Sequence, residues 1–320
     1  MNDFGDRSSS ILVVVDASNF EYMCIFSAAS RWEKLHSDES KLVLKETVWK
    51  TDQDNLPELL NYDSFRRVLK FVVQDKLEQL RSRISNNHQG DIDCATDVDV
   101  FFALDGELEK NFRKRLYPEY KAQRDLARQR FSIKNLKPYI QDVLFKELGL
   151  ETALGYRIVK VDGCESDDII ATIFKNYTGY MKRILFSSDK DFLQLKDVIQ
   201  YDCWGKRVER TIHDVVDEPV GRNDFLLWKI IRGDQSDNIK NVFPKYGDKK
   251  SWELVNDRKK LRQMLSENNS AFERFKLNST LIDFDNIPKD YTKRIMKVVD
   301  EKLSEKSFSG EFSLEECMVV

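Results

Sequence analysis

Short apolar runs that end at or near a carboxylate recur along the chain. Residues 11–15 and 98–104 are largely apolar and are followed at once by Asp16 and Asp105. Similar runs lie at residues 157–161, 184–188 and 198–203. A continuous apolar run of this length is typical of a strand that is buried on both faces of a parallel sheet. The pattern therefore predicts strands over these ranges.

Helical spacing of apolar residues separates the predicted strands. Residues 65–84 repeat apolar side chains with the period of an amphipathic helix of about six turns, whose apolar face would pack on the sheet. Another helix is expected to open with residues 165–168 and to include residues 169–173. Residues 31–61 show little periodicity and are expected to form an insertion. The alternation predicts an α/β fold with a mostly parallel central sheet flanked by helices.

The strand pattern stops after residue 213. Helical spacing takes over at residues 224–232, 249–256, 258–265 and 292–303. We therefore expect an α/β core over residues 1–213 and a smaller all-helical domain over residues 214–320, which ends in a loose tail.

Residues 107–135 differ from the predicted core helices. The segment is polar and basic, its apolar residues form no strong stripe, and Pro118 interrupts it. A helix without an apolar face is poorly suited to covering a sheet. We expect this segment to form helices that stand away from the core.

The distribution of charge is more informative than its sum. The net charge is −3, which by itself does not indicate a nucleic-acid-binding protein. Residues 110–130, however, carry eight basic side chains and two acidic ones, and residues 240–262 carry eight and three. These stretches could form positive surfaces around an acidic centre.

Cysteine usage and hydropathy indicate the compartment. None of the five cysteines forms a CxxC pair, which is typical of reduced thiols in a cytoplasm. The apolar run at residues 11–15 is too short for a signal peptide and follows Asp3 and Asp6. No stretch approaches membrane-spanning length. We expect a cytoplasmic monomer that makes no membrane contact.

Further acidic clusters extend the strand-end pattern, at residues 165–168, 189–191 and 233–238. The carboxyl ends of parallel strands meet at one edge of a sheet, where open α/β folds bind ligands. Carboxylates gathered there would repel one another unless cations lay among them, and Mg²⁺ prefers such oxygen ligands. The clusters therefore predict a metal-dependent phosphoryl-transfer site, where two ions about 4 Å apart could activate water and stabilise a leaving oxygen.

Each acidic residue also has a simpler explanation. A single Asp after a strand is more often a helix cap or a turn former. The helix dipole could stabilise one or two of the acids at residues 165–168. Neither effect explains five clusters after five apolar runs. The chain contains no GxxxxGK[ST] or GxGxxG motif, so nucleoside triphosphate or dinucleotide binding is unsupported.

The order and spacing of the acidic motifs resemble those of the 5′-nuclease family. This family includes flap endonucleases, the 5′-nuclease domain of bacterial DNA polymerase I and phage 5′-exonucleases. The motifs lie at residues 15–18, 104–106, 165–168, 188–192 and 233–238, and the resemblance extends over residues 11–294. Residues 277–288 look most like the phage ribonucleases H of this family, which remove replication primers.

The resemblance implies an activity and a setting. It implies a two-metal, structure-specific 5′→3′ nuclease with exonuclease and flap endonuclease activity on RNA–DNA and DNA duplexes. Such an enzyme would remove the RNA primers of lagging-strand fragments during phage DNA replication in the cytoplasm of a bacterial host. A sliding clamp and a single-strand-binding protein are the partners implied, with residues 311–314 as a clamp-docking segment or a disordered end.

The resemblance also implies a set of metal ligands. The cofactors would be two Mg²⁺ ions, with Mn²⁺ as a substitute. The first ion would be surrounded by Asp16, Asp105, Glu165 and Asp167, and the second would be served by Asp167, Asp189, Asp191 and Asp237. Asp168 and Asp234 would act through water.

The basic segment resembles the helical arch of the family, through which a 5′ single strand passes. Lys121 and Arg124 would contact the scissile phosphate and stabilise its developing charge, although Gln123 replaces the usual Asn. Basic and aromatic residues interleave as a single-strand funnel requires, and the implied contacts are Arg113, Lys114, Arg115, Tyr120 and Arg128. A solvated basic helix is the alternative. Tyr22 matches a residue that stacks on the terminal base, or is a core tyrosine.

One departure from the family concerns duplex binding. The family follows its GDxSDN motif with a glycine-rich turn that binds a monovalent cation, but residues 239–250 retain only Gly247 of these glycines. This argues against a bound K⁺. The duplex would instead be held by side-chain charge, with a steep salt dependence, through Lys240, Lys245, Lys249 and Lys250.

Three other hypotheses about the function are considered beside a 5′ nuclease. A protein that binds branched DNA without cutting it would not need the intact acidic set. PIN-type ribonucleases share an acidic α/β core but are shorter and lack the basic segment and the helical domain. A haloacid-dehalogenase-type phosphatase needs an Asp two residues after the first one, where this chain has Ser18.

Overall fold

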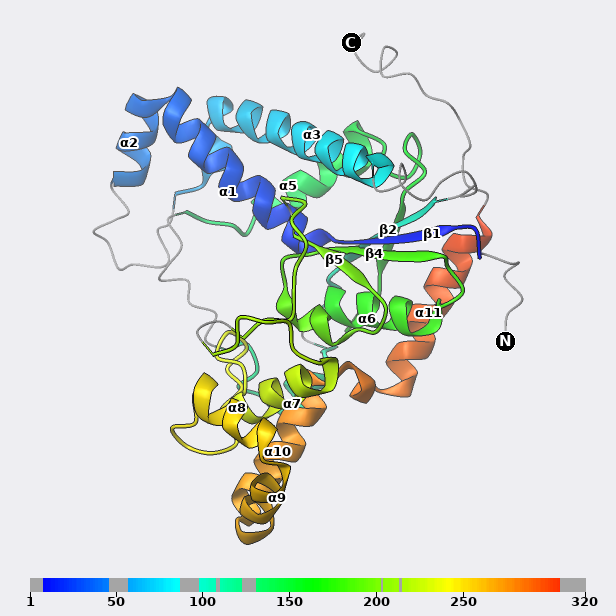
Figure 1. The fold of residues 1–320 in the computed structure, drawn as a ribbon. Coiled ribbons are helices and arrows are strands. Elements are labelled where there is room, and N and C mark those ends of the chain that lie inside the picture. Colours follow the sequence, from blue (N-terminus) through cyan, green and yellow to red (C-terminus); the bar gives the residue numbers. More distant parts are fainter. Residues whose placement is uncertain are drawn as a thin grey trace.

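A five-stranded parallel sheet forms the centre of the computed structural model, in the order β3-β2-β1-β4-β5 (Figure 1). The structure describes residues 8–45, 57–86, 98–107, 110–122, 131–202, 204–212 and 215–305. The strands are β1 (Ile11–Asp16), β2 (Val98–Leu104), β3 (Arg157–Lys160), β4 (Lys182–Phe186) and β5 (Ile199–Tyr201). The predicted α/β fold with a parallel sheet is confirmed.

The central strand β1 is buried on both faces because its side chains alternate between two cores. Val13 pairs with Val100 of β2 on one side and with Ile184 of β4 on the other. Ile11 and Val13 face the first core, whereas Leu12 and Val14 face the second. Because both faces are covered, apolar side chains fill every position of the strand before Asp16.

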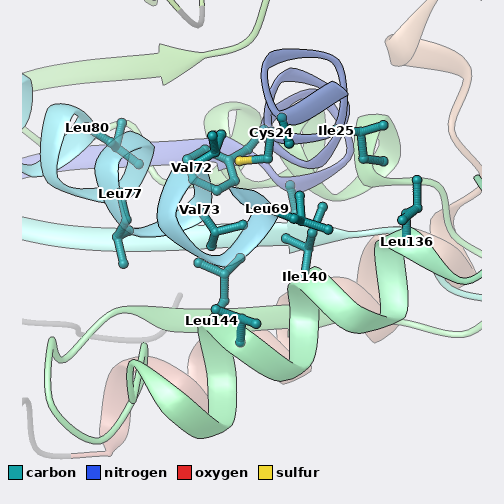
Figure 2. Packing of buried hydrophobic residues seen from close by; sticks show 14 of the residues in the cluster. Cys24, Ile25, Leu69, Val72, Val73, Leu77, Leu80, Leu136, Ile140 and Leu144 are labelled. Atoms are coloured by element: carbon teal, nitrogen blue, oxygen red, sulfur yellow. The ribbon is translucent and has the colours of Figure 1, made fainter. Parts of the chain in front are cut away.

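Helices α1 (Ala17–Leu35) and α3 (Asp63–Asn86) cover one face of the sheet (Figure 1). They pack with α5 (Leu136–Asp142) and the π-helical turn η5 (Val143–Glu147). Figure 2 shows Leu69 and Val73 of α3 between Cys24 of α1 and Ile140 of α5. The predicted amphipathic helix over residues 65–84 is confirmed as α3.

The predicted insertion at residues 31–61 is helical over much of its described part. Residues 31–35 end α1, α2 (Ser37–Lys45) follows, and η2 (Leu59–Asn61) leads into α3. The reason is tertiary packing, since Trp32 is fully buried and its indole N–H donates to Ser64 Oγ at 2.9 Å. Val43 is buried in the same core.

Helices α6 (Ser166–Asn176) and α11 (Lys289–Ser304) cover the opposite face (Figure 1). Ile295 and Val299 of α11 share a core with Ile170 of α6. The short helices η6 (Lys190–Gln194) and η7 (Phe284–Asn286) meet where Phe192 and Phe284 lie 5.8 Å apart between ring centroids. The last described helix thus packs on the α/β layer, and the domain division near residue 214 stays a prediction.

Four helices follow β5 before η7 in the described part of the chain, namely α7 (Arg222–Arg232), α8 (Asp248–Asn256), α9 (Arg258–Glu267) and α10 (Asn269–Ile282). The sequence did not predict α10, in which Ala271, Asn278, Leu281 and Ile282 are buried. Asn268 caps its start by accepting the Ala271 N–H at 3.0 Å. In the described ranges, no helix is both long and apolar enough to cross a membrane.

Residues 110–122 do not stand away from the core, contrary to the prediction for this segment. They form α4 (Phe112–Leu116) and a turn that packs into the molecule instead of standing away from it. Phe112 is buried with α6 and α11, while Tyr117 and Tyr120 are buried against α7 and α10. These buried rings are divided between a short helix and the turn that follows it, so they form no helical stripe in the sequence. Residues 123–130 lie outside the described residues.

Candidate metal centre and nucleic-acid interface

The carboxyl ends of β1 and β2 place Asp16 and Asp105 at one edge of the sheet. Asp16 caps α1 by accepting the Asn19 N–H at 3.1 Å, and it accepts the Ser187 hydroxyl at 2.8 Å. Asp105 accepts the Ser18 hydroxyl at 2.7 Å and the Ser166 N–H at 2.9 Å. These contacts join the ends of three strands, β1, β2 and β4, to the start of α6.

Glu165 and Asp168 form a capping box at the start of α6. Asp168 is fully buried and accepts the Arg113 guanidinium at 2.7 Å and the Glu165 N–H at 3.1 Å. Arg113 also donates to Glu165 at 3.3 Å and, through Nε, to the Leu281 carbonyl at 2.9 Å. Asp168 therefore forms an ion pair with Arg113 and caps the start of α6.

Lys121 joins the α6 carboxylates to the loop after α7. Its ammonium group lies 2.5 Å from Glu165 and 3.6 Å from Asp237. Its backbone N–H donates to the Asp237 carbonyl at 3.0 Å, and its φ of 56° is left-handed. Tyr120 supports the same bridge, since its hydroxyl lies 2.9 Å from Glu165 and 3.0 Å from Asp237.

Lys229 of α7 forms a second bridge. Its ammonium group contacts Asp191 and lies 3.1 Å from Asp234. Asp191 follows Asp189, which caps η6 by accepting the Asp191 N–H at 2.8 Å. Asp234 also accepts the N–H and hydroxyl of Ser236. The loop at residues 233–238 is closed by paired backbone bonds between Asp234 and Ile239.

Burial and neighbouring charges shift the pKa values of these acids in both directions. Burial, together with the neighbouring Asp189 and Asp105, raises the pKa of the Asp16 carboxyl to about 7. Burial also raises the pKa of Asp167 well above its ordinary value, with Asp189 and Glu165 adding to the effect. At Asp234 the effect of burial is outweighed by Lys229 and Ser236, and the pKa falls to about 2.

The acidic side chains offer the kind of oxygen ligand that hard divalent cations prefer. Buried carboxylates with raised pKa values are those to which an added cation would be most strongly attracted, and carboxylate oxygens suit Mg²⁺. The assignment of metal to these acids stays a prediction, for Asp16, Asp105, Glu165, Asp167, Asp168, Asp189, Asp191, Asp234 and Asp237. Over the described parts of the chain, no three acidic, histidine or cysteine side chains form a ready metal-binding group.

Two residues predicted to contact DNA are buried instead, which corrects those predictions. Arg113 is 2% exposed and Tyr120 is 3% exposed. Both side chains donate to the carboxylates described above, so they shape the acidic site from within. Burial, with Glu165 and Asp237, raises the pKa of the Tyr120 hydroxyl well above its ordinary value, which keeps it a donor.

The other predicted nucleic-acid contacts lie at the surface or outside the described residues. Arg124 and Arg128 belong to the undescribed residues 123–130. Arg115 donates to the Tyr291 hydroxyl at 2.6 Å, and Lys240 lies 3.4 Å from Glu119. The exposed lysines of the set are Lys114, Lys240, Lys245, Lys249 and Lys250. Tyr22 is half-buried on α1.

Sequence reasoning missed two lysines of the site. Lys229 is 8% exposed, four residues after the buried Phe225, so a lysine within an apolar stripe could have revealed it. Lys137 of α5 lies 3.1 Å from Ser18 Oγ and 3.3 Å from Glu21. Its position depends on a contact across 119 residues, and no local signal marks it.

Part of the chain matches the model of a known protein family. Residues 85–220 match the family model described as 5′-3′ exonuclease, N-terminal resolvase-like domain. This segment is similar to the N-terminal domain of 5′-3′ exonucleases. The resemblance drawn from the acidic motifs is thereby confirmed.

Known 5′-3′ exonuclease relatives match parts of the chain. The ribonuclease H of Enterobacteria phage T4 is 27% identical over 164 residues, which are 46% of this chain and 52% of that protein. The 5′-3′ exonuclease of Mycoplasmopsis pulmonis is 32% identical over 171 residues, which are 52% of this chain and 53% of that protein. The chain therefore spans about half the length of these relatives.

Solved structures share the fold over more of the chain. The T5 5′-exonuclease with bound zinc has a TM-score of 0.57 at 18% identity, covering 92% of this chain and 99% of that one. A T5 flap endonuclease solved with DNA and metal ions has a TM-score of 0.52 at 18% identity, covering 91% and 99%. These matches show that the chain has the fold of T5 5′-exonuclease.

Proposed function

We propose that the chain is a two-metal, structure-specific 5′→3′ nuclease with exonuclease and flap endonuclease activity. The observation that carries the proposal is the bridging of carboxylates from separate segments by Lys121 and Lys229 at one edge of the sheet. Two bound Mg²⁺ ions would supply Lewis-acid stabilisation of phosphoryl oxygens and a nucleophilic water near neutral pH. The fold of T5 5′-exonuclease and the exonuclease segment at residues 85–220 support this assignment.

The protein side chains have distinct roles in this proposal. Lys121 lies among the carboxylates and would stabilise negative charge on the scissile phosphate. Arg124, which lies outside the described residues, would share this role. Arg113 and Asp168 hold the start of α6 so that Glu165 and Asp167 keep their positions. Gly233, with a φ of 72°, lets the loop carrying Asp234 and Asp237 turn back, because a Cβ there would lie 2.5 Å from the Ile239 carbonyl.

The proposed substrates are RNA–DNA and DNA duplexes with a 5′ single-strand junction. The names of the relatives, ribonuclease H and 5′-3′ exonuclease, support this class. The role would be removal of RNA primers in phage DNA replication in the host cytoplasm, with a single-strand-binding protein and a sliding clamp as partners.

The test is cleavage of a labelled 5′-flap duplex and a nicked RNA–DNA duplex with Mg²⁺, with Mn²⁺ and with chelator. We expect short 5′ fragments that end in a 3′-hydroxyl to be released, and a 5′-phosphate to be left on the remaining strand, only when a divalent cation is present. Tight junction binding without cleavage in either metal would refute the nuclease and favour a branched-DNA-binding protein.

A further inference from the structure

An exposed aromatic ring lies one helical turn beyond Tyr22. Phe26 is 56% exposed, although its ring is large and apolar. It stacks nearly parallel to Tyr22, with ring centroids 6.2 Å apart and an interplanar angle of 14°. Residues four apart share one face of a helix, so both rings lie along the same side of α1.

The structure supports Phe26 from behind and leaves it open in front. The buried Phe131 packs against it at 6.4 Å between centroids, tilted by 53°. A ring fixed in this way loses little freedom when a second ring stacks on it, which favours binding. An exposed aromatic ring that packs on a neighbour but stays half open has the form of a stacking platform.

A chain of contacts connects this platform to the acidic site. The Lys137 ammonium lies 4.5 Å from the centre of the Tyr22 ring and 3.1 Å from Ser18 Oγ. Ser18 in turn donates to Asp105 at 2.7 Å. A cation and successive aromatic rings leading away from the phosphate-cleaving site are the combination that binds single-stranded nucleic acid.

We propose that Phe26 is a specificity-determining residue that stacks on the second unpaired base of a 5′ single strand, beyond the base at Tyr22. The inference rests on the proposed nuclease function. Because every base has a π-face, the contact selects for the length of the unpaired strand and not for its sequence. Phe26 would therefore raise kcat/KM for substrates with two or more unpaired nucleotides and leave it unchanged for shorter ones.

The experiment compares kcat/KM on duplexes with 5′ flaps of zero, one, three and five nucleotides. Relative to wild type, Phe26→Ala should lower the ratio of five-nucleotide to zero-nucleotide kcat/KM by about 5–150-fold, the range for loss of one stacked base. Phe26→Trp should preserve the ratio, and Phe26→Leu should lose it, since Leu is apolar but has no ring. An abasic second nucleotide should lower the wild-type ratio equally and add nothing to Phe26→Ala.

The control is Phe71→Ala, which removes another exposed ring that also lies beside a cation, Arg31. It should leave the length ratio unchanged. The stacking role would be overturned if either Phe26→Ala or Phe26→Leu kept the wild-type ratio of five-nucleotide to zero-nucleotide kcat/KM. If wild type cuts no substrate, the nuclease proposal fails separately, and quenching of 2-aminopurine at the second unpaired position, measured in chelator, still tests Phe26.

Discussion

At the scale of single residues, the two bridging lysines organise the acidic site. Lys121 contacts Glu165 and Asp237, while Lys229 contacts Asp191 and Asp234. A buried ammonium group is tolerated only when carboxylates compensate its charge. Each lysine therefore holds acids from separate segments within a short distance of one another.

The first prediction concerns Asp191, a proposed metal ligand. Asp191→Asn should lower the cleavage rate in Mg²⁺ by more than the ~10–100-fold that loss of an indirect metal partner costs, because a neutral amide is a poor cation ligand. Binding of the junction should be preserved. Single-turnover cleavage and a binding titration in chelator measure the two effects.

The matched control for Asp191 is Asp285→Asn. Asp285 is 65% exposed and lies 2.8 Å from Lys175, so its substitution also breaks one lysine contact. Cleavage should be unaffected. Unchanged turnover in Asp191→Asn would remove that residue from the metal site.

At the scale of elements, the loop after β2 must pass very close to the loop before α6. A Cβ built on Gly106 would lie 2.1 Å from the Val161 carbonyl oxygen, and the Gly106 N–H donates to the Cys164 carbonyl at 2.9 Å. This approach fixes Asp105 relative to Glu165. Glycine is required here by space.

The second prediction follows from that approach. Gly106→Ala should destabilise the fold by about 1–3 kcal/mol, as overpacking does, because backbone on both sides must move apart. Cleavage should also fall at temperatures where the variant is fully folded, since Asp105 would be displaced. Thermal unfolding and a cleavage assay measure the two effects.

Gly179→Ala provides the comparison, because a Cβ on Gly179 meets nothing within 4 Å. Its stability and cleavage should stay close to those of wild type. Equal stability of the two variants would show that the Val161 carbonyl leaves room for a Cβ at position 106.

At the scale of the whole molecule, basic side chains are concentrated in particular stretches of the chain. The chain carries a net charge of −3, yet residues 240–262 hold eight basic side chains and three acidic ones. Lys249 and Lys250 are exposed at the start of α8. Such a surface would bind duplex phosphates by counterion release.

The third prediction is that replacing Lys249 and Lys250 with Ala weakens duplex binding and flattens its salt dependence. The slope of log K against log salt should become less steep by about 2, one for each phosphate that a lysine no longer neutralises. Binding titrations across a salt series measure it. Replacement of Lys293 and Lys297, two exposed lysines of α11, removes the same charge and should leave the slope unchanged. The same slope in both double variants would place the duplex elsewhere.

The sequence by itself determined the sheet and the order of the acidic motifs. Apolar runs such as residues 11–15 are local signals, because a strand covered on both faces needs apolar residues at every position. A carboxylate can follow each run because the end of the strand is the first position where water or a cation can compensate its charge.

Only the tertiary structure decided how the remaining residues are used. Arg113 and Tyr120 belong to a basic, aromatic segment, and the sequence cannot distinguish an exposed funnel from buried donors. Lys137 and Lys229 reach the acids through contacts between distant elements. Burial and charge compensation depend on all the elements packed around a group, so the role of these residues was set by the fold and not by their local sequence.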